Sequence, residues 1–230
     1  MTPQLEDYIE KHISEEPDLL REIDRHTNLY RLNGRMCSGH IQGRLLKMLT
    51  SMVNPKKVLE LGTFTGYSAL SIAEALGKDA IVETIEADDE LEEEILFNIS
   101  RSPHGDKVKL YIGDALEVME TLEEETYDMA VIDADKRQYS QYFKAVMKLL
   151  KPGGFILADN TLWDGHVTES GNHSTQTKGI LEFNDLVVNT PGVDVAIIPI
   201  RDGLTIIRKN RIEDSSILCP LKDEDKLDAI

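Results

Sequence analysis

The chain has 230 residues, of which 41% are hydrophobic and 29% are charged, a balance that indicates a globular protein with a sizeable core. Its formal net charge of -17 at pH 7 excludes a broad basic face for nucleic acid or for an anionic membrane. Cys37 and Cys219 show no pairing or metal-ligand pattern, and no signal-like or membrane-length apolar run occurs, so we expect a reduced, cytoplasmic protein without a membrane segment.

The first 54 residues are predicted to form a helical cap. Leucine and isoleucine recur at helical spacing in Leu5–Ile13, in the charged stretch Glu15–Arg31 and in Ile41–Met52. This cap (1–54) precedes a segment with a different pattern.

Over residues 55–210 the pattern changes to strands that alternate with helices. The strands are predicted at Val58–Leu61, Ala80–Ile85, Val108–Ile112, Met129–Ile132 and Phe155–Ala158. The helices between them are predicted at Tyr67–Leu76, Asp88–Ser100, Ala115–Glu120 and Tyr139–Leu150. Lys151-Pro152-Gly153-Gly154 is predicted to stop the last helix and to open the fifth strand. This alternation is typical of a parallel sheet with helices on both faces.

The end of the core departs from that alternation. Val193–Ile200 and Leu204–Ile207 are both strand-like, and the connection between them is too short for a parallel crossover, so they predict an antiparallel hairpin. The expected fold is α/β: a doubly wound, mostly parallel seven-stranded sheet with a terminal antiparallel hairpin, preceded by N-terminal helices. We expect one domain over residues 1–210, and a charged C-terminal tail (211–230) outside it.

A glycine turn connects the first predicted strand to the first helix of the core. Gly62 and Gly66 are separated by three residues, whereas the dinucleotide-binding pattern is G-x-G-x-x-G. In an open α/β sheet, ligands bind at the carboxyl ends of the strands, where this turn lies. The spacing therefore indicates a ligand site but disfavours a pyrophosphate, and with it an NAD(P)-dependent oxidoreductase.

Acidic residues near this turn indicate the kind of ligand. Glu60 would repel a diphosphate but attract the ammonium group of an amino acid, and Glu86 ends the second strand, where an acid normally binds ribose hydroxyls. A nucleoside that carries an amino acid, such as S-adenosylmethionine, has an ammonium group for Glu60 and ribose hydroxyls for Glu86. Asp114, after the third strand, is expected to cap a helix and to face the adenine.

Oxygen-bearing side chains follow the fourth and fifth strands. Asp133 comes directly after the fourth strand, and Asp159 and Asn160 follow the fifth. If these strands are neighbours in a parallel sheet, two carboxylates and one amide meet at its carboxyl edge, a set suited to Mg²⁺, Mn²⁺ or Ca²⁺ rather than zinc. A cation there lowers the pKa of a bound hydroxyl. Lys136 would take up the departing proton if burial and the cation's charge lower its own pKa.

These motifs together resemble the class I, metal-dependent caffeoyl-CoA and catechol-type O-methyltransferases, especially their small bacterial members. The matching stretches are Leu59–Ser68, Val131–Lys136 and Asp159–Gly165, and Pro199–Leu204 is similar to the family's final hairpin. The resemblance implies a Rossmann-like methyltransferase fold and, in a homodimer, methyl transfer from S-adenosylmethionine to a hydroxyl of a small catechol- or hydroxycinnamoyl-type aromatic.

The resemblance also implies roles for individual residues. Asp133, Asp159 and Asn160 match metal ligands, and Lys136, with Asp133, matches the catalytic pair. The positions expected to contact S-adenosylmethionine are Met36, Ser38, Glu60, Gly62, Thr63, Ser68, Glu86, Ala87, Asp114, Ala115 and Asp133. Trp163 and Asp202 match substrate-side positions. The loop Gly165–Thr177 and the tail after Asn210 have no counterpart in the family pattern and leave the acceptor open.

Two alternatives stay open from the sequence. Some bacterial relatives resemble enzymes that methylate a hydroxylated wobble uridine in tRNA, and Arg31, Arg35, Arg44 and Lys47 are candidates for a local docking patch. A cofactor-binding or regulatory protein without catalysis is the other. The full set of predicted catalytic residues argues against the second, and the acidity of the chain argues against the first.

Overall fold

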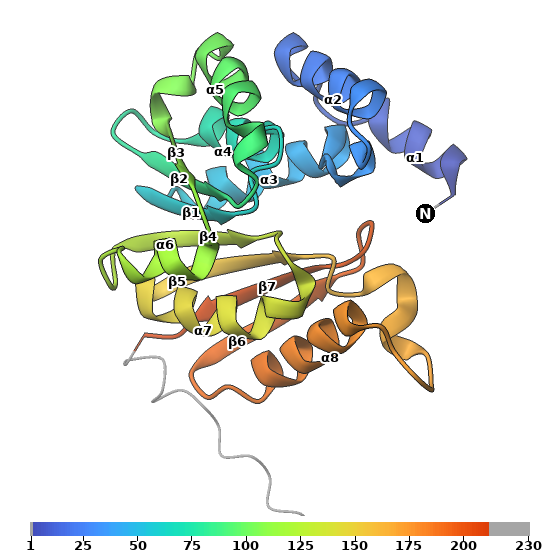
Figure 1. The fold of residues 1–230 in the computed structure, drawn as a ribbon, viewed down its shortest axis with the longest axis vertical. Helices are drawn as coiled ribbons and strands as arrows, with labels where there is room; N and C mark the ends of the chain where they lie inside the picture. Colours follow the sequence, from blue (N-terminus) through green and yellow to red (C-terminus); the bar gives the residue numbers. More distant parts are fainter. Residues whose placement is uncertain (1, 212–230) are drawn as a thin grey trace, which may run out of the picture.

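One seven-stranded sheet runs through the computed structural model, which describes residues 2–211 of the chain, in the order β3-β2-β1-β4-β5-β7-β6 (Figure 1). The strands are β1 (Lys57–Leu61), β2 (Ile81–Glu86), β3 (Val108–Ile112), β4 (Tyr127–Ile132), β5 (Leu150–Asp159), β6 (Val193–Ile198) and β7 (Leu204–Lys209). Strands β1 to β5 pair in parallel, and β7 pairs antiparallel with both β5 and β6. The predicted fold class is confirmed.

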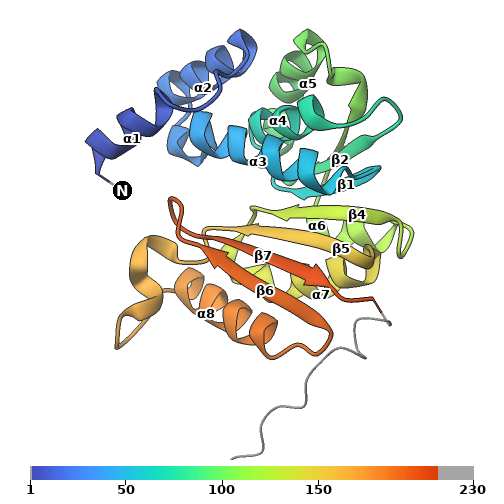
Figure 2. The same cartoon turned by 180° about the vertical axis from the view of Figure 1, so that it is seen from behind.

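Helices cover both faces of this sheet (Figures 1 and 2). They are α1 (Pro3–Glu10), α2 (Asp18–Tyr30), α3 (Gly39–Val53), α4 (Tyr67–Ala75), α5 (Glu92–Arg101), α6 (Ala115–Glu120), α7 (Tyr139–Leu149) and α8 (Thr175–Val188). Because alternate residues of a strand point to opposite faces, Leu59 packs with Phe143 of α7 and Phe183 of α8, while Val58 packs with Leu46 of α3 and Ile72 of α4. None of the helices within residues 2–211 is long and apolar enough to cross a membrane.

The N-terminal helices dock on the glycine turn. The Thr27 hydroxyl of α2 donates to the Thr65 hydroxyl at 3.0 Å, and both residues are buried. The Tyr67 hydroxyl, at the start of α4, donates to the carboxylate of Glu16, just before α2, at 2.5 Å. The predicted helical cap therefore lies directly over the carboxyl edge of β1.

Two elements differ from the sequence-based predictions. Lys151-Pro152-Gly153-Gly154 follows the end of α7, as predicted, but β5 already includes it and so begins earlier than the predicted Phe155; Gly153 has a φ of 87°, and the pairing with β4 shifts register there. In a sequence, glycines at such an irregularity suggest that the strand starts only after them. No helix was expected at α8, although Ser174 caps it by accepting from the Thr177 amide at 3.1 Å. The remaining tail prediction (212–230), with Cys219, lies outside the described residues.

Candidate active site

The glycine turn brings the ends of β1 and β4 into close contact. Gly62 has a φ of 93°, and a Cβ atom placed on it would lie 2.0 Å from the main-chain oxygen of Asp133. Only glycine fits both this backbone conformation and this approach. Gly66, with a φ of 86°, forms the N-cap of α4. Asp133 is thereby held beside the turn.

Glu60 is a buried carboxylate, and one of its two oxygens accepts no hydrogen bond within residues 2–211. The residue is 1% exposed, and its Oε2 atom accepts a hydrogen bond from the Thr84 hydroxyl at 2.6 Å. Its Oε1 atom has no hydrogen-bond partner among the described residues. Burial raises the pKa of Glu60 to about 7. A buried acceptor without a donor is costly unless a ligand supplies one.

Glu86 holds the glycine turn in shape. Its Oε2 atom accepts from the main-chain amides of Thr63 and Phe64 at 3.1 and 2.7 Å, and its Oε1 atom accepts from the Asp88 amide at 2.9 Å. A carboxylate has about four acceptor positions, so these bonds leave capacity for one ligand hydroxyl. The residue predicted to bind ribose therefore also shapes the turn.

The other predicted cofactor residues lie around the same edge. A narrow cavity of about 20 Å³ is lined by Met36 and Ser38 on one side and by Gly62, Thr63, Ser68 and Asp133 on the other. Asp114 caps α6 by accepting from the amides of Leu116 and Glu117 at 2.8 and 3.2 Å, as expected. Ala115 follows it and is buried, whereas Ala87 is exposed beside Glu86. A nucleoside is larger than this cavity, which is closed on one side by Met36, Cys37 and Ser38.

The three predicted metal ligands lie on neighbouring strands. Asp133 follows Ile132, whose register partner across the sheet is Ala158, and Asp159 and Asn160 follow Ala158. Asp159 is 6% exposed, and burial together with the nearby Asp133 carboxylate raises its pKa. Within residues 2–211 no three His, Cys, Asp or Glu side chains form a ready-made metal site. The candidate set therefore consists of two carboxylates and one amide.

Lys136 bonds directly to the residue after β4 and, through Tyr139, to the end of β5. Its Nζ atom donates to Asp133 Oδ1 at 2.7 Å and to the Tyr139 hydroxyl at 2.8 Å, and that hydroxyl lies 3.0 Å from the main-chain oxygen of Asp159. Burial on its own lowers the pKa of Lys136, but the Asp133 carboxylate and Tyr139 outweigh it and raise the pKa above its ordinary value. In this arrangement Lys136 is an ammonium ion paired with Asp133.

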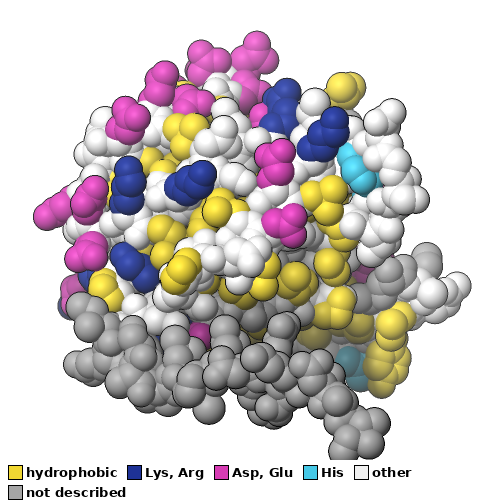
Figure 3. All heavy atoms as spheres, turned by 90° about the horizontal axis from the view of Figure 1, so that it is seen from below, with side chains coloured by type: hydrophobic (Ala, Val, Ile, Leu, Met, Phe, Trp, Pro, Cys, Tyr) yellow, Lys and Arg dark blue, Asp and Glu magenta, His cyan; other side chains and the backbone are white. Residues whose placement is uncertain are grey.

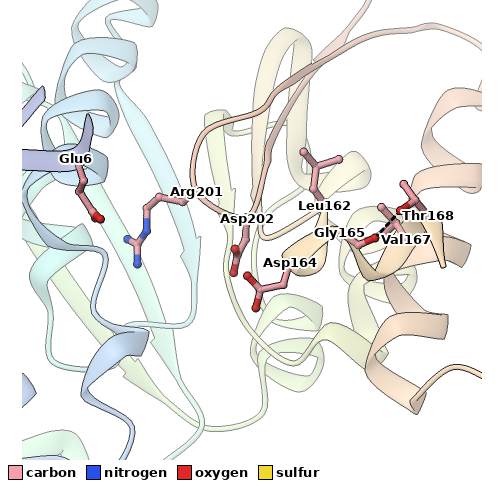
Figure 4. A pocket seen from close by; sticks show the side chains of 8 residues that line it. All are labelled: Glu6, Leu162, Asp164, Gly165, Val167, Thr168, Arg201 and Asp202. Atoms are coloured by element: carbon pink, nitrogen blue, oxygen red, sulfur yellow. Dashed lines mark hydrogen bonds between the residues drawn. The ribbon is translucent and has the colours of Figure 1, made fainter. Parts of the chain in front are cut away.

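A larger cavity is lined by residues of α1, of the segment that follows β5 and of the β6–β7 connection (Figure 4). It has a volume of about 460 Å³, within the usual range for small-molecule sites. Glu6, Asp164 and Asp202 line it, with Arg201 as the cation among its lining residues. Asp164 and Asp202 point toward one another in Figure 4, and burial together with Asp164 raises the pKa of Asp202. Of the two predicted substrate residues, Asp202 lines the cavity, while Trp163 packs against the hydrophobic core.

Comparison with known proteins gives the family. A sequence model described as "O-methyltransferase" matches residues 10–210. The chain is 31% identical to caffeoyl-CoA O-methyltransferase 2 of Populus trichocarpa, over 84% of this chain and 83% of that protein. It is 31% identical to caffeoyl-CoA O-methyltransferase 5 of Nicotiana tabacum, over 84% of this chain and 85% of that protein. The chain belongs to the O-methyltransferase family.

Solved structures agree with the fold of this O-methyltransferase. The O-methyltransferase of Bacillus cereus in complex with SAH superposes with a TM-score of 0.83 at 26% identity, over 90% of this chain and 97% of that one. The SAH-bound methyltransferase PaMTH1 of Podospora anserina gives 0.83 at 28% identity, over 90% and 94%.

The sequence analysis did not predict the cavity residues Glu6, Asp164 and Arg201, nor three residues that bond to the predicted ones. Thr84 and Tyr139 bond to Glu60 and Lys136, as described above. Gln42, on α3, donates from Nε2 to Asp159 Oδ2 at 2.7 Å. The spacing of Lys136 and Tyr139 on one helical turn was a local signal for their contact. Thr84 and Gln42 contact residues far away in sequence, and the sequence carries no local signal for them.

Proposed function

We propose that this O-methyltransferase transfers the methyl group of S-adenosylmethionine to a hydroxyl of a small aromatic acceptor, with a divalent cation held at the ends of β4 and β5. Mg²⁺ is the expected cation. The observation that carries the proposal is the convergence of Glu60, Asp133, Lys136 and Asp159 at one edge of the sheet, next to a cavity of about 460 Å³. The family's homodimer and a cytoplasmic location belong to the same proposal.

The residues around the glycine turn fit S-adenosylmethionine. The partnerless Oε1 atom of Glu60 suits the ammonium group of its methionine part, and the remaining acceptor capacity of Glu86 suits a ribose hydroxyl. Two glycines with positive φ let the backbone approach such a ligand closely. SAH in the Bacillus cereus and Podospora anserina relatives supports the same cofactor.

The residues after β4 and β5 fit a divalent cation. Asp133 and Asp159 repel each other, as the raised pKa of Asp159 reflects, and a hard cation relieves that repulsion. Carboxylate and amide oxygens are the ligands that Mg²⁺ and Ca²⁺ prefer. Asp133, Asp159 and Asn160 would hold the cation.

The chain's own groups account for the proton and for orientation. When bound, the cofactor supplies an electrophilic methyl group and the cation makes the acceptor hydroxyl more acidic. Glu60 and Glu86 would hold the cofactor at the glycine turn, where it would donate its methyl group to the acceptor oxygen and keep the electron pair of the broken S–CH₃ bond on sulfur. Once it has lost a proton to solvent, Lys136 would accept the hydroxyl proton at Nζ. To act as a base, Lys136 needs a lower pKa than it has beside the Asp133 carboxylate. A cation that binds Asp133 would weaken this ion pair and lower the pKa of Lys136.

The charge of the larger cavity supports one acceptor over the others. The cavity carries three carboxylates and one guanidinium, which favours an uncharged catechol over a polyanionic CoA thioester. Ion pairs weigh against the tRNA alternative, since three of the four residues of its candidate docking patch are paired with acids: Arg44 and Lys47 with Glu74, at 2.7 and 2.5 Å, and Arg31 with Glu94. Figure 3 shows a face on which Lys and Arg side chains are interleaved with Asp and Glu rather than gathered.

Methyl transfer from labelled S-adenosylmethionine tests the proposal. We expect transfer to catechol that EDTA abolishes and Mg²⁺ restores, with weaker transfer to caffeoyl-CoA. Asp159→Asn should lose about 100-fold or more of the Mg²⁺-supported rate, while SAH affinity measured without a divalent cation stays within about threefold, because the change removes a proposed cation ligand and not a cofactor contact. Full activity in EDTA would refute the cation, and cofactor binding without transfer to either acceptor would refute the small aromatic acceptor.

A further inference from the structure

A buried glutamine connects three parts of the proposed site that are distant in sequence. Gln42 lies in the first turn of α3 and is 6% exposed. Its Nε2 atom donates to Asp159 Oδ2 at 2.7 Å, and its Oε1 atom accepts from Arg201 Nη1 at 2.6 Å. The same guanidinium nitrogen also donates to the main-chain oxygen of Ser38. One side chain therefore bridges the end of β5 and the β6–β7 connection.

The chemistry of these partners fixes how the amide is oriented. A carboxylate accepts and a guanidinium only donates, so the Asp159 side requires the NH₂ group and the Arg201 side requires the carbonyl. An amide is the side-chain group of this size that satisfies both at once. Methionine has a similar length and volume but offers neither bond, which separates the polar role of Gln42 from its packing.

Each end of this chain of bonds reaches a different part of the site. Asp159 is a proposed cation ligand. Ser38 lines the narrow cavity beside the glycine turn, opposite Gly62 and Thr63. Arg201 lines the larger cavity next to Asp202. The β6–β7 connection that carries Arg201 extends toward α3 in both views of the fold (Figures 1 and 2).

We propose that Gln42 is a positioning residue that orients the Asp159 carboxylate for a divalent cation and, through Arg201 and the Ser38 carbonyl, couples cation binding to closure of the Met36–Ser38 segment over the cofactor. This inference rests on the proposed function. Outer hydrogen bonds to a metal ligand typically contribute 10- to 100-fold to metal affinity. Coupling between two sites is reciprocal, so the cation strengthens cofactor binding by the factor by which the cofactor strengthens cation binding.

Binding measurements on the full chain test this without an activity readout. The probes are Mn²⁺, followed by electron paramagnetic resonance of the free ion, and SAH, followed by calorimetry with and without Mn²⁺. The variants are Gln42→Met, Arg201→Met and the double variant. Gln141→Met is the matched control, because Gln141 is an exposed glutamine on α7. The melting temperature of each variant reports on folding.

We expect Gln42→Met to weaken Mn²⁺ binding about tenfold or more and to abolish the effect of Mn²⁺ on SAH affinity, with SAH affinity in the absence of Mn²⁺ within about threefold of wild type. Arg201→Met should weaken Mn²⁺ binding less but lose the same coupling. The double variant should bind Mn²⁺ no more weakly than Gln42→Met, since both residues act in one chain of bonds. Gln141→Met should match wild type.

Two results would overturn the inference, and they differ from each other. If wild type binds Mn²⁺ and Gln42→Met binds it equally well, or keeps the coupling to SAH, Gln42 has a packing role only. In that case a lower melting temperature is its sole effect. If wild type binds no Mn²⁺ while it binds SAH, the proposed cation site itself is wrong, and the role of Gln42 falls with it.

Discussion

At the scale of single residues, the burial of Glu60 costs stability that a ligand can restore. The pKa of this carboxyl is about 7 in the folded chain because the group is buried, against an ordinary value of 4.5. When folding raises the pKa of an acid, burial of that acid costs no stability below the unfolded pKa, where the group is protonated in both states. The cost grows as the pH rises towards the folded pKa, above which the folded chain has to bury a charge. Between about pH 4.5 and 7 the difference amounts to roughly 3 kcal/mol.

Glu60→Gln tests this at two levels. At pH 8 the variant should unfold at a higher temperature than wild type, because it no longer buries a charge, and at pH 5 the difference should vanish. SAH should bind wild type more tightly as the pH rises from 6 to 8, since ionised Glu60 pairs with its ammonium group, and the variant should show a flat profile. Calorimetry and thermal unfolding across this pH range measure both. Equal pH profiles for the two proteins would contradict the role of Glu60.

At the scale of elements, the glycine turn is the contact that sets β1 against β4. Gly62→Ala should lower the free energy of unfolding by more than about 3 kcal/mol, because the new Cβ meets the Asp133 main-chain oxygen and the backbone has a positive φ. Gly77→Ala is the control, since a Cβ there has no heavy atom within 4 Å. Urea unfolding of both variants measures the difference. Equal stability would show that the turn tolerates a side chain.

The strands and the turn between β1 and α4 could be predicted from the sequence, whereas contacts between distant elements could not. Short apolar runs bounded by glycine or acid predicted the positions of β1 to β4, and adjacency of parallel strands predicted that Asp133 and Asp159 would meet. Such inferences depend on local periodicity and on one topological rule. The contact of Gln42 with Asp159 depends instead on how α3 docks against the end of β5, and no local pattern encodes that docking. The early start of β5 was missed for a different reason, because proline and two glycines usually mark a turn rather than a strand.

At the scale of the whole molecule, the net charge of -17 acts on any charged acceptor before it reaches the cavity. Raising the ionic strength from about 20 to about 200 mM shortens the screening length from roughly 20 to 7 Å, so repulsion of an anion weakens. The KM for caffeoyl-CoA should therefore fall several-fold, while the KM for catechol should stay constant. Steady-state kinetics at constant Mg²⁺ measure both. A fall of equal size for catechol would exclude a charge effect.

The strand order has a further consequence while the chain is being made. Strand β7 lies between β5 and β6, so the outer edge of β5 stays unpaired until the last strand leaves the ribosome. An unpaired apolar strand edge recruits other chains. A chain that ends at Gly203 should aggregate, whereas one that ends at Arg211 should elute as a single species in size-exclusion chromatography; identical elution would contradict this. Nascent chains of this protein are thus most in need of a chaperone in the interval after β5 has emerged and before β7 has.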